Sequence, residues 1–235
     1  MRRYWSFLLR PWSGDPRQGK VSSHVLRLAS EFDCGFNSVM PAADFNLDSV
    51  VRMEWEKLQR TDARSASAFY FRSVLPSVVL HHQQQAAPLP PCELLVSLMG
   101  LSPETTVLAT AIVRPQRLVI IASRKAGHYC DQCMDFLTEH RLIAREAISA
   151  HFVEPTDHDA LHGALCAALA TASGRRLVDL TGGKKIMSAV AGYAAWTRGL
   201  PVCYLESGAY NEQMRRPEPG SEQIFILEPP VSQLG

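Results

Sequence analysis

The chain has 235 residues, of which 46% are hydrophobic and 20% are charged, with a formal net charge of +1. This composition is typical of a folded protein and excludes a chain that is disordered throughout. The small net charge also disfavours bulk binding of nucleic acid by an overall positive surface. The length suits one large domain, or one ordinary domain with a smaller one.

The first twelve residues, MRRYWSFLLRPW, contain an apolar stretch that Arg10 and Pro11 interrupt. It is too short for the apolar region of a secretory signal. The longest apolar window, residues 105–122, contains Arg114 and Arg117, so we expect no membrane-spanning segment. The sequence therefore predicts a cytoplasmic protein that has no membrane partner.

Residues 1–80 contain segments such as VSSHVLRLASEF and LDSVVRMEWEKLQR. They predict a small N-terminal domain, either mixed α/β or helical, whose type the residues do not identify. The segment VVRMEWEKL places Val51, Trp55 and Leu58 on one face of a helix. This face is expected to pack against a core.

Residues 81–92, HHQQQAAPLPPC, are first polar and then rich in proline. Proline cannot continue a helix, so this composition predicts a linker. A second domain is expected over residues 93–235. We expect a piece that begins at residue 91 to fold without the preceding part.

After the predicted linker, short apolar runs alternate with helical patterns. The runs are LLVSL (94–98), RLVIIAS (117–123), AISAHFV (147–153), RLVDL (176–180), PVCYL (201–205) and QIFIL (223–227). Helical patterns cover residues 129–142, 157–172 and 184–198. This alternation predicts an α/β fold, a Rossmann-like and mostly parallel sheet flanked by helices, with the last strand at an edge.

In an open parallel sheet, ligands bind beyond the carboxyl ends of the strands. The loop after the first of these strands, MGLSPETT, offers Gly100 for close backbone approach and the hydroxyls of Ser102 and Thr105. The loop after the second strand supplies Arg124 and Lys125. Both loops are candidates for contact with a polar or anionic ligand.

A third loop, TGGKK, follows Asp179 at the end of the fourth of these strands. Thr181, Gly182 and Gly183 form the turn, and Lys184 begins a helix. Glycines allow a phosphate to approach the backbone, and N–H groups at a helix start favour anions. The segment contains neither GxxxxGK[ST] nor GxGxxG, so it differs from the usual nucleotide loops. The alternative is a tight turn with solvated lysines.

Six cysteines occur, and only Cys130 and Cys133 form a CxxC pair. A zinc site needs a second pair or suitably spaced histidines, so we expect no metal and no cofactor. A weak metal or redox site that includes the neighbouring His128 is the alternative to an ordinary helix turn. Cys166 and Cys203 are expected in the core because their surroundings are apolar.

Two segments together resemble a known family. They are LLVSLMGLSPETTVLATAIVRPQRLVIIAS and LVDLTGGKKIMSAVAGYAAWTRGLPVCYLES. They are similar to the CRISPR-associated Rossmann fold (CARF) domains, which pair a first-strand loop of the G-x-S-P type with a D-x-T-G-G-[TK]-K-x-M segment. The resemblance covers residues 93–229 and does not extend to residues 1–90. The first lysine of TGGKK stands where the commoner TGGTK has a threonine.

The resemblance implies a homodimer that binds a cyclic oligoadenylate, the second messenger of type III CRISPR antiviral defence, across its two-fold axis. The implied ligand-binding residues are Gly100, Ser102, Thr105, Arg124, Lys125, Thr181, Gly182, Gly183 and Lys184. Gly182, Gly183 and Lys184 would hold phosphate or ribose, and Ser102 and Thr105 would meet the ring. Met187 and Ile186 are expected to pack their helix onto the sheet.

Three functions follow from this reading. The first is a sensor and effector in which the ligand controls an N-terminal output domain, for example a nuclease. The second is a ring nuclease that cleaves its ligand without metal, with Lys184 and Ser102 as the catalytic candidates. The third is a ligand-dependent regulator or adaptor without catalysis. RNA or DNA is an expected partner only if the N-terminal domain is a nuclease or a regulator.

Overall fold

The structure is a computed structural model, and it describes residues 36–38, 45–212 and 216–229. Its strands are β1 (Phe36–Ser38), β2 (Leu94–Met99), β3 (Arg117–Ser123), β4 (Ile148–Val153), β5 (Arg176–Asp179), β6 (Val202–Ser207), β7 (Tyr210–Asn211), β8 (Arg216–Pro217) and β9 (Glu222–Leu227). Its α-helices are α2 (Ser49–Thr61), α3 (Ala63–Phe69), α4 (Leu75–Gln85), α5 (Pro103–Val113), α6 (Gly127–Glu139), α7 (His158–Ala170) and α8 (Lys185–Trp196). A π-helix, η1 (Tyr70–Val74), and two 3₁₀-helices, η2 (Arg124–Ala126) and η3 (Arg145–Ala147), complete the elements.

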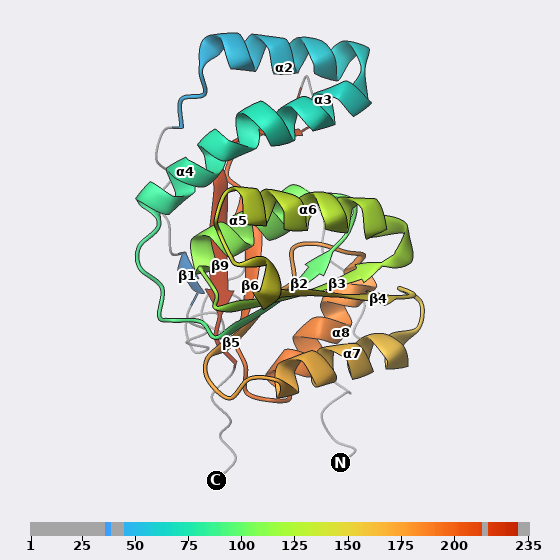
Figure 1. Ribbon diagram of the computed structural model, residues 1–235. Coiled ribbons are helices and arrows are strands. Elements are labelled where there is room, and N and C mark those ends of the chain that lie inside the picture. Colours follow the sequence, from blue (N-terminus) through green and yellow to red (C-terminus); the bar gives the residue numbers. More distant parts are fainter. Residues whose placement is uncertain (1–35, 39–44, 213–215, 230–235) are drawn as a thin grey trace, which may run out of the picture. The chain divides into compact units, whose positions relative to one another are not determined.

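The main sheet has the strand order β1-β9-β6-β5-β2-β3-β4 (Figure 1). The five strands from β6 to β4 run parallel, whereas β9 pairs antiparallel with β6 and with the short β1. Numbered along the chain and without β1, the order is 3-2-1-4-5-6, which is that of the doubly wound Rossmann fold. The predicted fold class is confirmed.

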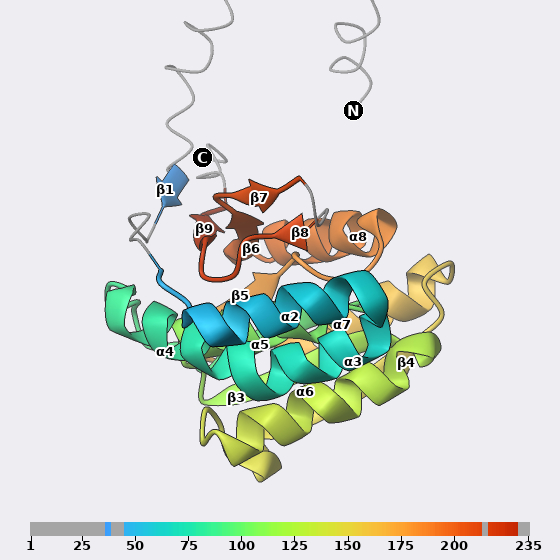
Figure 2. The same ribbon diagram turned by 90° about the horizontal axis from the view of Figure 1, so that it is seen from above.

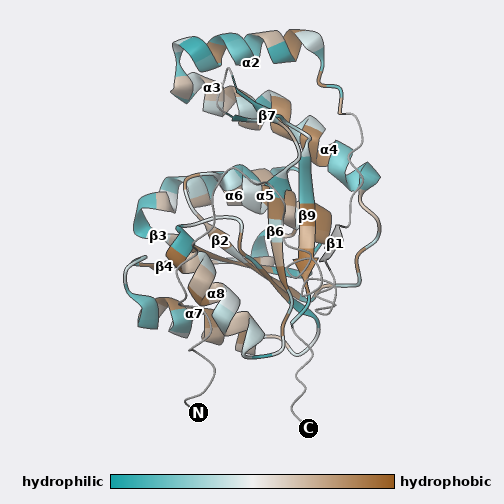
Figure 3. Ribbon diagram, turned by 180° about the vertical axis from the view of Figure 1, so that it is seen from behind, coloured by the Kyte–Doolittle hydropathy of each residue, from teal (hydrophilic) through white to brown (hydrophobic). Residues whose placement is uncertain are grey.

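Helices cover both faces of this sheet. Helices α5 and α6 lie on one face and α7 and α8 on the other (Figure 1). Successive residues of β2 alternate between two core clusters, with Leu95 in the first, and Leu94 and Val96 in the second. Figure 3 shows the same pattern, with hydrophobic strands inside and more hydrophilic helices around them. The central strands β2, β3 and β5 are apolar on both faces because helices cover both sides of the sheet there.

Most strand bounds agree closely with the sequence prediction. Strand β3 has the predicted bounds, and β4 begins one residue later than predicted. Strand β9 is not at the sheet edge as predicted, because β1 pairs along its outer side. Between β6 and β9, strands β7 and β8 pair antiparallel as a hairpin.

Helices α2 to α4, most of which fall within the predicted N-terminal domain of residues 1–80, share a hydrophobic core with the sheet. Residues Gly35–Gly235 form one compact unit, and Trp55, Val74 and Leu75 belong to the same core cluster as residues of β2 and β3. Helix α4 packs on α5, whose two sides are therefore both buried (Figure 2). Residues 1–35, the first part of the predicted output region, lie outside the described residues.

The predicted linker over residues 81–92 is in part helical, because α4 continues to Gln85. The apolar face of α4, with Val78 and Val79, is buried and includes the fully buried His82. The Nε2 atom of His82 lies 3.1 Å from the Glu222 carboxylate of β9. Burial of this face accounts for the extension of the helix into a polar sequence. The backbone becomes extended at Ala86, directly after the helix.

The β7–β8 hairpin lies beside α2 (Figure 2). Arg52 of α2 forms a 2.9 Å ion pair with Glu218, which follows β8. Glu218 also accepts a 2.8 Å hydrogen bond from Asn211.

In the described part of the chain, no helix is both long enough and apolar enough to cross a membrane.

Candidate functional site

The loops that follow β2 and β5 lie against each other at the carboxyl edge of the sheet. A Cβ atom on Gly100 would lie 3.1 Å from the backbone nitrogen of Gly183. A Cβ atom on Gly182 would overlap the carbonyl oxygen of Leu98. Gly183 has a φ of +80°, a left-handed conformation that favours glycine. Position 182 thus has no space for a side chain, and a side chain at position 100 would press on the other loop, because the two backbones touch.

This contact lies at the topological switch point of the sheet. Strands β2 and β5 are neighbours, and the chain winds away from them in opposite directions. Ligands of doubly wound sheets bind in the crevice that forms at this point. The two sequence motifs are thus brought together where the fold favours a ligand site.

A buried hydrogen-bond network holds the second loop. Asp179, the fully buried last residue of β5, accepts a 2.7 Å bond from the Ser97 hydroxyl of β2. It also accepts bonds from the Thr181 N–H at 3.0 Å and the Thr181 hydroxyl at 2.6 Å. The Thr181 oxygen in turn accepts a 2.8 Å bond from the N–H of Leu205 on β6. The network links three neighbouring strands.

Burial raises the pKa of Asp179 above its ordinary value, although the bonds from Thr181 and Ser97 favour the ionised form. The acid therefore serves to fix the loop and does not face solvent. Thr181 was predicted to bind ligand, and its hydroxyl is already engaged with Asp179 and Leu205. Its direct contact with a ligand stays a prediction.

Lys184 stands at the start of α8 with an extended backbone, and its side chain is exposed and makes no capping hydrogen bond. The following Lys185 is exposed as well. Met187 is buried under the loop, as predicted. Ile186 was predicted to pack onto the sheet, but 41% of its surface is exposed. It points away from the sheet because it lies one residue before the buried position of the helix.

Arg124 and Lys125 form part of η2, directly after β3, and both are exposed. Because β3 is the parallel neighbour of β2, this basic pair lies at the same edge of the sheet as the two loops. Their contact with a ligand stays a prediction, as it does for Ser102 and Thr105.

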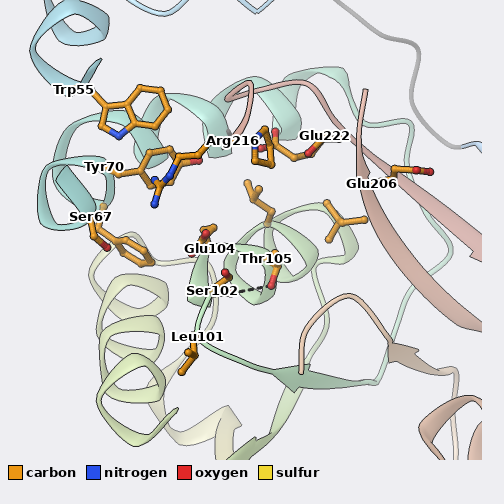
Figure 4. A pocket seen from close by; sticks show the side chains of 15 residues that line it. Trp55, Ser67, Tyr70, Leu101, Ser102, Glu104, Thr105, Glu206, Arg216 and Glu222 are labelled. Carbon is orange, nitrogen blue, oxygen red and sulfur yellow. Dashed lines mark hydrogen bonds between the residues drawn. The ribbon is translucent and has the colours of Figure 1, made fainter. Parts of the chain in front are cut away.

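A cavity of about 300 Å³ lies beside the first loop (Figure 4). Its walls come from the N-terminal helices, from the start of α5, from the end of β6 and from the β8–β9 region. The lining residues are Trp55, Ser67, Tyr70, Phe71, Leu101, Ser102, Glu104, Thr105, Leu108, Leu205, Glu206, Ser207, Arg216, Pro217 and Glu222. Ser102 and Thr105 therefore line this cavity, whereas the TGGKK loop does not.

Two acids and one arginine of this cavity influence one another. Burial raises the pKa of Glu104, and the nearby Glu222 adds to this effect. The backbone N–H of Glu104, the Arg216 guanidinium and the Ser102 hydroxyl act in the opposite direction without cancelling it. Burial also raises the pKa of Tyr70, with smaller contributions from Glu222 and Glu104.

The sequence reasoning did not select Glu104, although it lies inside the quoted SPET motif between two selected residues. Arg216 also lines the cavity. Its neighbour Arg215 lies outside the described residues. The sequence analysis also did not predict the π-helix that carries Tyr70. Such helices often occur at functional sites.

Cys130 and Cys133 are fully buried on α6. Burial raises the pKa of Cys130 to about 11 and that of Cys133 further still. The described residues contain no group of three or more His, Cys, Asp and Glu side chains that could hold a metal ion. The pair is thus part of the helix packing, as is the buried Cys203, whereas Cys166 is only partly buried.

The chain matches no protein-family model and no curated protein. It is similar to the solved structure of Can2 from Sulfobacillus thermosulfidooxidans in complex with cyclic tetra-adenylate, with 17% identity over 48% of this chain and 32% of that chain, at a TM-score of 0.41. It is also similar to Enterococcus italicus Csm6 bound to cyclic hexa-2′-fluoro-hexa-dAMP, with 15% identity over 49% of this chain and 34% of that chain, at a TM-score of 0.41.

A third solved structure is an O-methyltransferase family protein from Burkholderia thailandensis. The identity is 10% over 76% of this chain and 63% of that chain, at a TM-score of 0.41. This chain thus spans about a third of the length of Can2 and Csm6, and slightly less than two thirds of the methyltransferase. Its own strand order defines the protein as Rossmann-like.

Proposed function

We propose that this protein binds a cyclic oligoadenylate at the paired loops 99–106 and 181–184, across the two-fold axis of a homodimer. The observation that carries the proposal is the contact between Gly100 and Gly183, which joins the two sequence motifs of the CARF resemblance at the switch point. The buried Asp179 holds this arrangement before any ligand arrives. A preformed loop lowers the entropic cost of binding.

The chemistry of the edge suits an anionic ring. Lys184 offers an exposed ammonium group beside the N–H groups at the start of the twelve-residue helix α8. Ser102 offers an exposed hydroxyl from the first loop, and Arg124 and Lys125 add charge at the rim. A ring of identical nucleotides is matched by two copies of one surface, because an isologous dimer presents each contact twice.

The proposed role is that of a sensor in type III CRISPR antiviral defence. Helices α2 to α4 share a core with the sheet domain, so a change at the loops reaches the N-terminal part through packed side chains. The output is assigned to the N-terminal region, whose first 35 residues lie outside the described structure. A ring nuclease is the second outcome that the experiment separates.

The test is to incubate the purified protein with cyclic tri-, tetra- and hexa-adenylate, and to measure the melting temperature and the fate of each ring by mass spectrometry. Lys184→Ala is expected to reduce the shift in melting temperature, while Lys185→Ala, the matched control, retains most of it. A stabilised protein with an intact ring supports the sensor, and linear product supports the ring nuclease. If no ring shifts the melting temperature, the proposed function is wrong.

A further inference from the structure

We propose that the cavity beside the first loop binds an adenine base, and that Glu104 recognises the amine-bearing edge of that base. This rests on the proposed function in one respect, that the base belongs to the bound ring. The cavity itself is an independent observation. Its volume of about 300 Å³ lies at the lower end of small-molecule sites and is too small for a whole ring of nucleotides.

One wall of the cavity is aromatic. Trp55 of α2 and the π-helix residues Tyr70 and Phe71 line it, and the rings of Trp55 and Tyr70 lie with centroids 5.5 Å apart (Figure 4). Aromatic side chains and arginine guanidinium planes are the groups on which nucleic-acid bases stack. A flat heterocycle that binds between this wall and Leu101 would be removed from water and would contact both sides of the cavity.

The opposite wall provides the polar recognition. Glu104 projects from the first turn of α5 into the cavity, next to Ser102 and Thr105 (Figure 4). A neutral carboxylic acid has one O–H donor and one carbonyl acceptor. The edge of adenine presents the complementary pair, an amine donor at N6 and an acceptor at N1. An ionised carboxylate has no donor, so it cannot satisfy N1.

The surroundings of Glu104 favour the neutral acid. Burial and the Glu222 charge raise its pKa against the opposing effects of Arg216 and Ser102. The titratable groups that face the cavity from the other elements are Tyr70 of η1, Glu206 of β6, Arg216 of β8 and Glu222 of β9. Glu222 is paired with His82 of α4, and Glu206 is exposed. The raised pKa extends the pH range over which Glu104 can offer a donor to a base.

Binding of a base in this cavity would give the N-terminal helices a physical role. The cavity wall that would stack on the base belongs to α2 and η1, while the wall that would read its edge belongs to the ligand loop. A bound base would therefore join the two parts of the molecule. Release of the base would remove that contact from α2 and η1.

The test uses the full chain with adenosine, which carries no titrating phosphate, and with N6,N6-dimethyladenosine, which lacks the N6 donor. Binding is measured by calorimetry between pH 5 and pH 8. Wild type is expected to prefer adenosine over its dimethyl derivative by about tenfold, because the derivative leaves the carbonyl acceptor of Glu104 without a donor and its methyl groups block the contact. Its adenosine affinity should fall as the pH rises through the pKa of Glu104.

Glu104→Gln retains a donor and an acceptor but does not titrate. It is expected to keep the preference for adenosine and to lose the Glu104-dependent part of the pH profile. Glu104→Ala should lose about tenfold in affinity, whereas Glu139→Gln, at an exposed acid that ends α6 and does not line the cavity, should behave as wild type. Melting curves of each variant establish that it is folded.

The nucleoside measurements test the pocket, and the ring-binding measurements test the proposed function, so either proposal can be wrong without the other. Equal binding of adenosine and its dimethyl derivative by wild type overturns the pocket assignment, and this comparison needs no variant. Ring binding that Glu104→Ala leaves unchanged also overturns it, while the proposed function stands. Glu104-dependent adenosine binding without any ring binding supports the pocket and overturns the proposed function.

Discussion

The Ser97 hydroxyl on β2 donates a 2.7 Å hydrogen bond to Asp179, the last residue of β5. The two residues are partners in the parallel register of these strands, and both are fully buried. Ser97 also lies 3.0 Å from the Thr106 hydroxyl of α5. One polar chain thus connects the helix after the first loop with the strand before the second, so both loops depend on it.

Replacement of Asp179 by alanine should destabilise the protein and abolish ring binding. The Ser97 hydroxyl and both donors of Thr181 would lose their acceptor, at a cost of roughly 2–4 kcal/mol in the free energy of unfolding. Asp179→Asn keeps one carbonyl oxygen and should cost only about 1 kcal/mol. Urea unfolding followed by circular dichroism measures both. An alanine variant as stable as wild type would contradict the structural role.

The raised pKa of Asp179 predicts a pH dependence of stability. Because burial raises its pKa in the folded protein above the ordinary 3.8, the native state binds more protons than the unfolded state. Its contribution to stability is complete below pH 3.8 and is lost as the pH rises through the folded value. Asp179→Asn lacks this contribution, so its melting temperature should approach or exceed that of wild type as the pH rises. Parallel profiles of the two proteins would refute this.

Gly182→Ala tests the contact between the two loops. The added methyl group would overlap the Leu98 carbonyl oxygen, which belongs to a central strand and cannot move easily. We expect a loss of about 1–3 kcal/mol in stability and loss of ring binding. The control is Gly163→Ala in α7, where no atom lies within 4 Å of the added Cβ. It should stabilise the helix by about 0.5–1 kcal/mol and leave binding intact.

The position of the predicted linker has a consequence for truncation. A piece of residues 91–235 would expose the face of α5 that α4 covers, together with the partners of Trp55 and Val74. We expect this piece to aggregate or to lose its near-UV circular dichroism, whereas Gly35–Gly235 should fold. A monodisperse piece 91–235 with a cooperative melt would restore the two-domain interpretation.

Thiol labelling gives an independent test of the burial. Cys166 is partly buried, whereas Cys133 and Cys203 are fully buried, and burial raises the pKa of both of the latter thiols. Among the five cysteines of the described residues, Cys166 should react first with a maleimide under native conditions, because thiolates that are accessible react fastest. Mass spectrometry of digested samples identifies the labelled positions. Early labelling of Cys133 would contradict the packing of α6.

The sequence was informative where local pattern and burial agree. The bounds of β3 were predicted because residues 117–123 are buried on both faces and bounded by polar residues. The position of the two loops at one edge of the sheet was predicted, but the direct contact of Gly100 with Gly183 depends on strand pairing across 83 positions of the chain. Distant pairing of this kind leaves no local periodicity.

The cavity could not be predicted for a related reason. Its walls combine residues 55–71, 101–108 and 205–222, three stretches that have no shared motif. The extent of α4 was missed because HHQQQ has a polar composition, and only the cover provided by β9 and α5 makes His82 a core residue. Tertiary packing decided both features.

The neighbouring position of β2 and β5 also constrains how the molecule is made. During synthesis, β2 emerges long before β5, and the stretch between them must form β3, β4 and three helices on the side of β2 that β5 does not use. The anchor of Thr181 on Leu205 then requires β6 as well. Non-local contacts of this kind form late, since the loop between the partners must first be closed. A nascent chain shorter than about 205 residues therefore lacks the anchored TGGKK loop, and the proposed ligand edge is assembled only when the sheet is nearly complete.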